Sequence, residues 1–285
     1  MLDFALSTVA THNRTIAESL TVAEDAGFDA VELRTFGPGS TQFACDPAMT
    51  DEPKLRALID ASGIDCCSIA TGVRLDEPIF PPIIGRAFVD NERQIREGKH
   101  AIDLAAQIEV PLVRVFGFDR HGGESLKQTS KRVAWRLAMV CDHARNTGVR
   151  VVLENGGAFP SAEAIRDLID RVDSPHLGAS YNAAVGRLAG DDPVGSIELL
   201  GDSLLLARVK DAVGGNPVRL GEGELDVEGT VSALAGAGAG ADIPVVFEWD
   251  AAWFPQLEPV ESVASEALAR LCGWAGQTDT ARMTA

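Results

Sequence analysis

The chain has 285 residues, of which 46% are hydrophobic and 24% are charged, a composition typical of a globular protein and unlike that of a disordered chain. No apolar run approaches the roughly 18 residues that a membrane-spanning helix needs, so we expect no membrane partner. The formal net charge of −17 and the pI of about 4.6 argue against nucleic acid as a partner, because an acidic surface repels phosphates. The start, MLDFALSTVA, has no basic signal-peptide region, and the five cysteines show no CxxC spacing, so we expect a cytoplasmic protein with buried thiols.

Short apolar runs alternate with longer amphipathic segments along the chain, and this order predicts parallel strands connected by crossover helices. Eight strands are predicted, at Phe4–Ser7, Ala30–Leu33, Ile64–Ile69, Leu112–Phe116, Val149–Leu153, His176–Ser180, Leu204–Val209 and Val245–Glu248. Helices are predicted at Asn13–Ala26, Pro53–Ser62, Asn91–Gln107, Leu126–Thr147, Ala162–Val172, Val227–Ala235 and Pro259–Trp274.

Eight strand–helix units favour a closed α/β barrel of the (β/α)8 type, the TIM barrel, over an open nucleotide-binding sheet. The first predicted strand is not followed by GxGxxG, which an open dinucleotide-binding sheet would carry. We therefore expect residues 1–275 to form one barrel domain and residues 276–285 to form a flexible tail.

Polar residues stand at the C-terminal ends of most of the predicted strands, where barrel enzymes place their active sites. These residues are Glu32, Arg114, Glu154, Asn182, Arg208, Lys210 and Glu248. Because a buried charge is costly unless it is paired, one such residue is readily explained as a rim ion pair, whereas so many together indicate a functional site.

The sequence resembles the xylose-isomerase-like barrel superfamily of sugar isomerases and epimerases over nearly its whole length. The resemblance rests on the order and spacing of six segments, 27–33, 113–117, 151–155, 209–211, 220–226 and 247–249. Members usually hold one divalent ion with Glu, Asp, His and Glu side chains from strands five to eight, and two glutamates move a proton between adjacent carbons.

Two of these four ligand positions depart from the family pattern. Glu154 and Glu248 match the two glutamates, but Asn182 stands in place of the aspartate and Arg208 in place of the histidine. A guanidinium has no lone pair for a cation. We therefore expect either no cofactor or a weakly bound Mn, Mg or Zn ion, held at most by Glu154, Asn182 and Glu248.

The resemblance implies an isomerase or epimerase acting on a small polyhydroxylated carbonyl compound, namely a sugar, cyclitol or keto acid. Glu154 and Glu248 would be the acid/base pair, and Arg208 would stabilise the enediolate electrostatically in place of a metal. The predicted substrate contacts are Asn182, Lys210, Glu32, Arg114, Trp249 and His12.

Several alternatives remain open from the sequence. A lyase or dehydratase would start with the same proton abstraction, and a non-catalytic sugar-binding or partner subunit would need no turnover. For Trp249, core packing is an alternative to a wall against the substrate. Relatives commonly form homodimers, although no residue of this sequence marks an interface.

Overall fold

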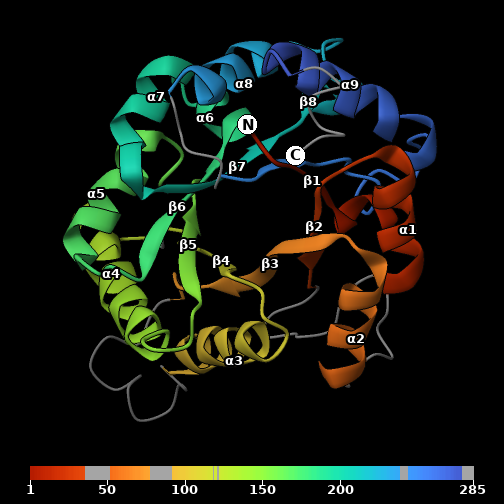
Figure 1. Cartoon of the computed structure of the whole chain (residues 1–285). Coiled ribbons are helices and arrows are strands. Elements are labelled where there is room, and N and C mark those ends of the chain that lie inside the picture. Colours follow the sequence, from red (N-terminus) through yellow and green to blue (C-terminus); the bar gives the residue numbers. More distant parts are fainter. Residues whose placement is uncertain (36–51, 78–91, 118, 121, 238–242, 278–285) are drawn as a thin grey trace.

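A computed structural model describes residues 1–35, 52–77, 92–117, 119–120, 122–237 and 243–277. These residues form a closed barrel of parallel strands inside a ring of helices (Figure 1), which confirms the predicted (β/α)8 class. The strands follow one another around the barrel as β1 (Phe4–Ser7), β2 (Ala30–Arg34), β3 (Asp65–Arg74), β4 (Leu112–Phe116), β5 (Arg150–Glu154), β6 (Leu177–Asn182), β7 (Leu204–Val209) and β10 (Val245–Phe247), and β10 pairs with β1.

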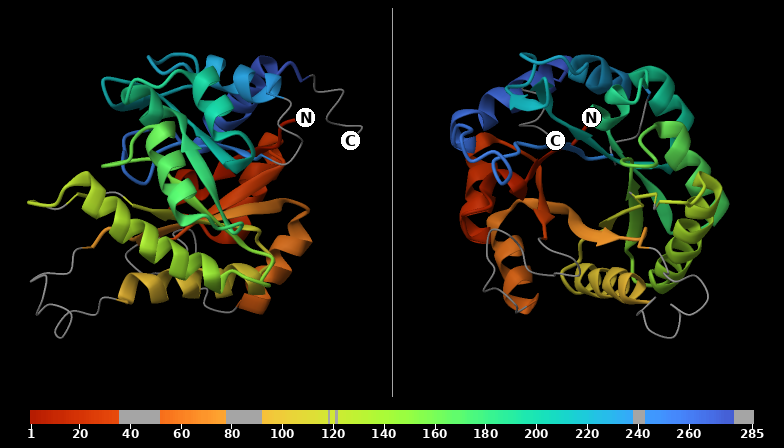
Figure 2. Two further views of the ribbon diagram at one scale, coloured as in Figure 1. Left: turned by 90° about the vertical axis from the view of Figure 1, so that its left-hand side faces the viewer. Right: turned by 180° about the vertical axis from the view of Figure 1, so that it is seen from behind.

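The helices surround the strands, as the side and rear views in Figure 2 show. They are α1 (Ile16–Ala26), α2 (Glu52–Ser62), α3 (Arg93–Gln107), α4 (Leu126–His143), α5 (Ala162–Val172), α6 (Ala183–Leu188), α7 (Pro193–Leu200), α8 (Val227–Gly236) and α9 (Ala264–Trp274). Short 3₁₀ turns lie at η1 (Thr8–Thr11), η3 (Gly201–Ser203) and η4 (Val260–Ser262). No helix among the described residues is long and apolar enough to cross a membrane.

The sequence analysis missed four short elements and misplaced the ends of several others. The hairpin of β8 (Asp211–Val213) and β9 (Asn216–Val218) and the helices α6 and α7 were not predicted, because each is too short to show a period. Helix α4 ends at His143, before the predicted Thr147, and Asn146 then adopts a positive φ of 64°. Of the predicted tail, residues 278–285 lie outside the described residues, so the division into domain and tail stays a prediction.

The interior of the barrel is layered, and the strand register creates the layers. A cluster of apolar residues separate from the main core contains Ala5, Ala30, Leu112, Val152, Leu206 and Val246. The residues two positions further along the same strands are Ser7, Glu32, Arg114, Glu154, Arg208 and Glu248. Because alternate strand residues point to the same face, a polar layer lies directly beyond the apolar one, towards the C-terminal ends of the strands. We call these C-terminal ends the mouth.

Candidate active site

Arg208 on β7 is the centre of the polar layer, and its side chain is completely buried. Its guanidinium reaches β2, where Nη2 donates to Glu32 Oε1 at 2.7 Å and Nη1 donates to Glu32 Oε2. Nη2 also donates to Glu248 Oε1, and Nε lies 3.3 Å from Glu154 Oε2. Burial opposes the charged form, but the three carboxylates outweigh it and raise the pKa of Arg208 well above its usual value.

Glu32 lies within this buried layer, at 0% exposure, and not at the surface of the mouth. Ser7 Oγ donates to its Oε1 at 3.0 Å and Ser68 Oγ to its Oε2 at 2.9 Å, in addition to the bonds from Arg208. Burial favours the neutral acid, but Arg208 outweighs it and lowers the pKa of Glu32. The predicted direct substrate contact is thus corrected, since Glu32 has no exposed surface and instead holds Arg208 in place.

Glu154, at the end of β5, has donors on both carboxylate oxygens. Arg114 Nη1 donates to its Oε2 at 2.7 Å, and Asn182 Nδ2 donates to its Oε1 at 3.1 Å. Arg114 is itself only 3% exposed. The structure therefore brings together three of the predicted residues, with Arg114 and Asn182 as neighbours that orient the Glu154 carboxylate.

Asn155 is a positioning residue that the site prediction omitted. It is fully buried, its Nδ2 donates to the Asn182 carbonyl at 3.1 Å, and its Oδ1 accepts from the Asn182 backbone N–H at 2.6 Å. These bonds tie the end of β5 to the end of β6 and so fix the Asn182 side chain against Glu154. An amide directly after a strand-end glutamate was the only signal in the sequence.

Glu248 follows β10 and has one oxygen that is less tightly held than the other. Its Oε1 accepts from Arg208, whereas Oε2 lies 3.5 Å from Lys210 Nζ. Burial favours its neutral form, but Arg208 and Lys210 outweigh it and lower the pKa of Glu248 far below its usual value. Glu248 is therefore an ionised carboxylate at neutral pH.

Lys210 is the partly exposed cation of the cluster, with 27% of its side chain exposed. Its Nζ donates to Asp250 Oδ2 at 2.9 Å. Burial would lower the pKa of Lys210, but Glu248 and Asp250 outweigh it and raise that pKa above its usual value. Asp250, which the site prediction also omitted, has a raised pKa that burial causes first and Glu248 supports.

The two remaining predicted substrate contacts are Trp249 and His12. Trp249 is 2% exposed, its Nε1 donates to the Glu258 carbonyl at 2.9 Å, and its ring stacks on Phe247 with the centroids 6.5 Å apart. The alternative of core packing therefore holds for Trp249. His12 follows η1 after β1, and its Nδ1 is buried without a hydrogen-bond partner among the described residues.

The donor set of this site does not suit a divalent ion. Glu32, Glu154 and Glu248 converge, but the Arg208 guanidinium stands among their oxygens as a fixed cation. Asn182 presents its Nδ2 to Glu154, and an N–H donor is not a metal ligand. Within the described part of the chain, no group of three or more His, Cys, Asp or Glu side chains is arranged to hold a metal.

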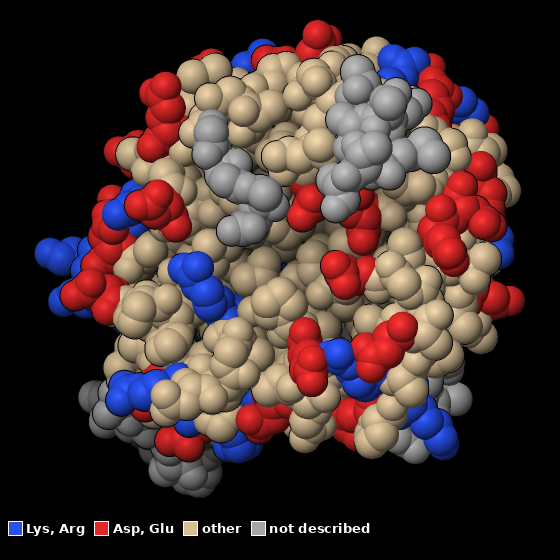
Figure 3. Space-filling model, viewed as in Figure 1, with Lys and Arg blue, Asp and Glu red and all other residues tan. Residues whose placement is uncertain are grey.

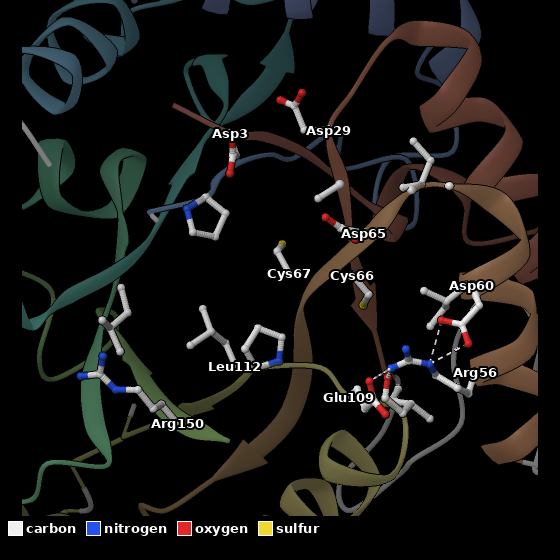
Figure 4. A pocket seen from close by; sticks show the side chains of 18 residues that line it. Asp3, Asp29, Arg56, Asp60, Asp65, Cys66, Cys67, Glu109, Leu112 and Arg150 are labelled. Atoms are coloured by element: carbon white, nitrogen blue, oxygen red, sulfur yellow. Dashed lines mark hydrogen bonds and ion pairs between the residues drawn. The ribbon is translucent and has the colours of Figure 1, made fainter. Parts of the chain in front are cut away.

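A hollow of about 720 Å³ lies at the other end of the barrel, where the strands begin. Figure 4 shows Asp3, Asp29, Asp65 and Cys67 around it, and Figure 3 shows acidic side chains beside the central depression on this face. The apolar layer separates this hollow from Arg208, and burial raises the pKa of the Cys67 thiol to about 12, which makes it a poor nucleophile. Barrel enzymes carry their chemistry at the mouth, so the Arg208 cluster is the candidate site.

The sequence matches the family described as xylose isomerase-like TIM barrel over residues 20–273, and the chain belongs to that family. The predicted superfamily is thereby confirmed. A search of curated protein sequences finds no match to the chain.

Three solved structures illustrate the structural similarity. An L-ribulose 3-epimerase is 20% identical with a TM-score of 0.77, and the match covers 100% of this chain and 97% of that one. An IolI protein with a bound zinc atom is 14% identical with a TM-score of 0.77, over 96% and 98% of the two chains. The probable 3-DHS dehydratase AsbF from Bacillus anthracis is 18% identical with a TM-score of 0.73, over 95% and 98%.

The chain spans 42% of the length of another similar structure, a xylose isomerase-like TIM barrel/4-hydroxyphenylpyruvate dioxygenase fusion protein, at 18% identity and a TM-score of 0.75. These identities establish the shared fold alone. The neighbours include an epimerase and a probable dehydratase, and at these identities the similarity to them concerns the fold.

Proposed function

We propose that the chain is an isomerase or epimerase that moves a proton on a small polyhydroxylated carbonyl compound through an enediolate, without a metal ion. The observation that carries the proposal is the placement of Glu154 and Glu248 at the mouth, both in contact with Arg208. Arg208 stands where family members usually have a histidine ligand. A protein cation thus contacts both carboxylates.

Glu248 is the better placed of the two bases. Its lowered pKa keeps it ionised, and its Oε2 has the looser contacts. In the reaction, this oxygen takes a proton from the carbon beside the carbonyl, and the electron pair moves onto the carbonyl oxygen. Glu154, after taking up a proton from water, completes the acid/base pair. It returns this proton to the former carbonyl carbon in isomerisation, while the hydroxyl proton of the neighbouring carbon moves to the former carbonyl oxygen, or to the same carbon from the opposite side in epimerisation. Glu248 then releases its proton to water, which restores both carboxylates.

The complete burial of Arg208 changes the role that the sequence suggested for it. A side chain at 0% exposure has no surface for the substrate, so Arg208 holds the glutamates and does not touch the enediolate. Lys210 takes over the electrophilic role, because it is partly exposed, protonated and 3.5 Å from Glu248 Oε2. Its ammonium group stabilises the oxygen on which negative charge develops.

A lyase is the second candidate, and the structural similarity to a probable dehydratase supports it. It begins with the same proton abstraction and ends with the loss of a leaving group from the next carbon. A non-catalytic sugar-binding subunit is the third. A small-molecule partner, a homodimer and a cytoplasmic location belong to the same proposal.

Solvent exchange tests the proposal directly. We expect a panel of aldoses, ketoses, cyclitols and keto acids in D₂O to reveal at least one compound whose C–H proton is replaced by deuterium, followed by ¹H NMR. Exchange should persist after chelation and should be lost in Glu248→Gln, while Glu228→Gln, an exposed glutamate on α8, retains it. Exchange that needs an added metal would refute the metal-free site. An absence of exchange across the panel would leave the binding subunit as the better explanation.

A further inference from the structure

The outer face of α4 carries exposed apolar side chains far from the charged mouth. Trp135 is 52% exposed and Met139 is 40% exposed, and their i, i+4 spacing places them side by side on the helix. The opposite face of α4 packs into the core through Val133, Leu137 and Val140, which are fully buried. Helix α4 itself lies on the outside of the barrel (Figure 2, left). A half-exposed tryptophan beside an exposed methionine is the kind of patch that marks an interaction surface.

A stripe along this face is complementary to itself when it is reversed. Lys131, Trp135, Ala138 and Asp142 are spaced i, i+4, i+7 and i+11, so they follow one line along the helix. A cation stands at one end of the stripe and an anion at the other, with a large ring and a small residue between them. Asp142 accepts from Arg145 Nη2 at 2.5 Å and is still 68% exposed, so its carboxylate is open to a second cation.

We propose that the chain forms a symmetric dimer in which α4 packs antiparallel against α4 of a second copy. In this arrangement Lys131 faces Asp142 of the partner subunit, and Trp135 lies over Ala138 of the partner subunit. Met139 flanks the contact, where its sulfur packs favourably against an aromatic ring. The two-fold axis makes every contact occur twice. A parallel pairing would instead place Lys131 beside Lys131 of the partner subunit, which is unfavourable.

The charges of the chain favour a second copy at this face over any other. The chain carries a net charge of −17, so two copies repel each other over most of their surfaces. The cation and the anion of the stripe balance. Two further cations of α4 are engaged within their own chain, since Arg132 pairs with Glu124 and Arg136 donates to the Leu75 carbonyl. The outer face of α4 therefore offers an apolar centre with little net charge, where two acidic chains approach with least repulsion.

This inference rests on the homodimer that was included in the proposed function, and it is independent of the reaction. None of the residues of the stripe belongs to the polar layer that carries Glu154 and Glu248. A single pair of helices also buries less area than a standard protein interface, so we expect a dissociation constant in the micromolar range.

Sedimentation velocity over a series of chain concentrations tests the interface. Trp135→Glu should raise the dissociation constant about tenfold or more, because a central tryptophan commonly dominates the binding free energy of an interface. Leu188→Glu is the matched control, at a leucine of α6 that is 81% exposed, and it should leave the dissociation constant unchanged. Circular dichroism confirms that both variants fold.

Exchanging the two charges tests the antiparallel arrangement. Lys131→Asp and Asp142→Lys should each raise the dissociation constant by about fivefold, because each variant places like charges at both ends of the contact. The double variant should recover the wild-type value, since a cation and an anion again face each other. Recovery of this kind is not expected if the two residues act only within their own chain.

The outcomes separate this inference from the proposed reaction. A wild type that stays monomeric at submillimolar concentration, a dimer that Trp135→Glu leaves intact, or a double variant without recovery would each overturn the interface. Proton exchange by a monomeric wild type would overturn the interface and leave the proposed reaction standing. A dimer that depends on Trp135, without any proton exchange, would support the interface and count against the reaction.

Discussion

Replacing Arg208 by methionine should make the free energy of unfolding depend steeply on pH. The substitution removes the cation that contacts Glu32, Glu154 and Glu248, while Arg114 still neutralises Glu154 and Lys210 still neutralises Glu248. Glu32 alone loses the cation bonded to it. At a separation near 3 Å and an effective dielectric constant of 20, such a contact is worth ~5 kcal/mol of Coulomb energy.

Protonation limits the cost of that loss. A carboxyl group with an ordinary pKa of 4.5 requires about 3.4 kcal/mol to be protonated at pH 7 and roughly 0.8 kcal/mol at pH 5. We therefore expect the free energy of unfolding to fall by about 3 kcal/mol relative to the wild type at pH 7 and by about 1 kcal/mol at pH 5, since buried Glu32 becomes a neutral acid whose pKa is raised.

The free energy of unfolding of the wild type should instead fall as the solution becomes acidic. The folded pKa values of Glu32 and Glu248 are lowered, so their contribution to stability is complete above the ordinary value of 4.5 and is lost as the pH falls through the lowered values. Urea unfolding followed by tryptophan fluorescence between pH 3 and pH 8 measures both curves. A deficit in Arg208→Met that is the same at every pH would refute the reasoning, and Arg145→Met, at an exposed ion pair, is the matched control.

Three further predictions concern the mouth. Glu248→Gln and Glu154→Gln should each reduce turnover by about 10²-fold or more in a chain that still folds, and full activity in both would contradict the acid/base pair. Arg208→His places an imidazole at the position where family members usually have one, so calorimetry should show zinc binding by this variant. Equal zinc binding by the wild type would show that the guanidinium does not prevent metal binding. Asp211→Ala removes the acceptor of four backbone N–H groups. We therefore expect the free energy of unfolding to fall by about 2 kcal/mol and trypsin to cleave faster at Arg219. An unchanged cleavage rate would show that the loop after β7 holds its shape without the carboxylate.

The sequence by itself was enough to predict the barrel fold and to predict which end of the barrel carries the charged residues. The alternation of short apolar runs with amphipathic segments is a local property, and it located the eight strands, three of them with the bounds that the structure has. The residues that end these strands, Glu154, Arg208 and Glu248 among them, were identified for the same reason, because strand polarity alone places them at the mouth.

Only the tertiary structure decided which of these side chains touch one another and which face the substrate. Arg208 and Glu32 are 176 residues apart and meet because the barrel closes, and Arg34 and Arg114 meet at Thr71 because β3 lies between their strands. Whether Arg208 is buried and Lys210 accessible depends on the register of all eight strands together. No local period in the chain encodes that register, which is why the sequence could propose the site residues but could not divide the roles among them.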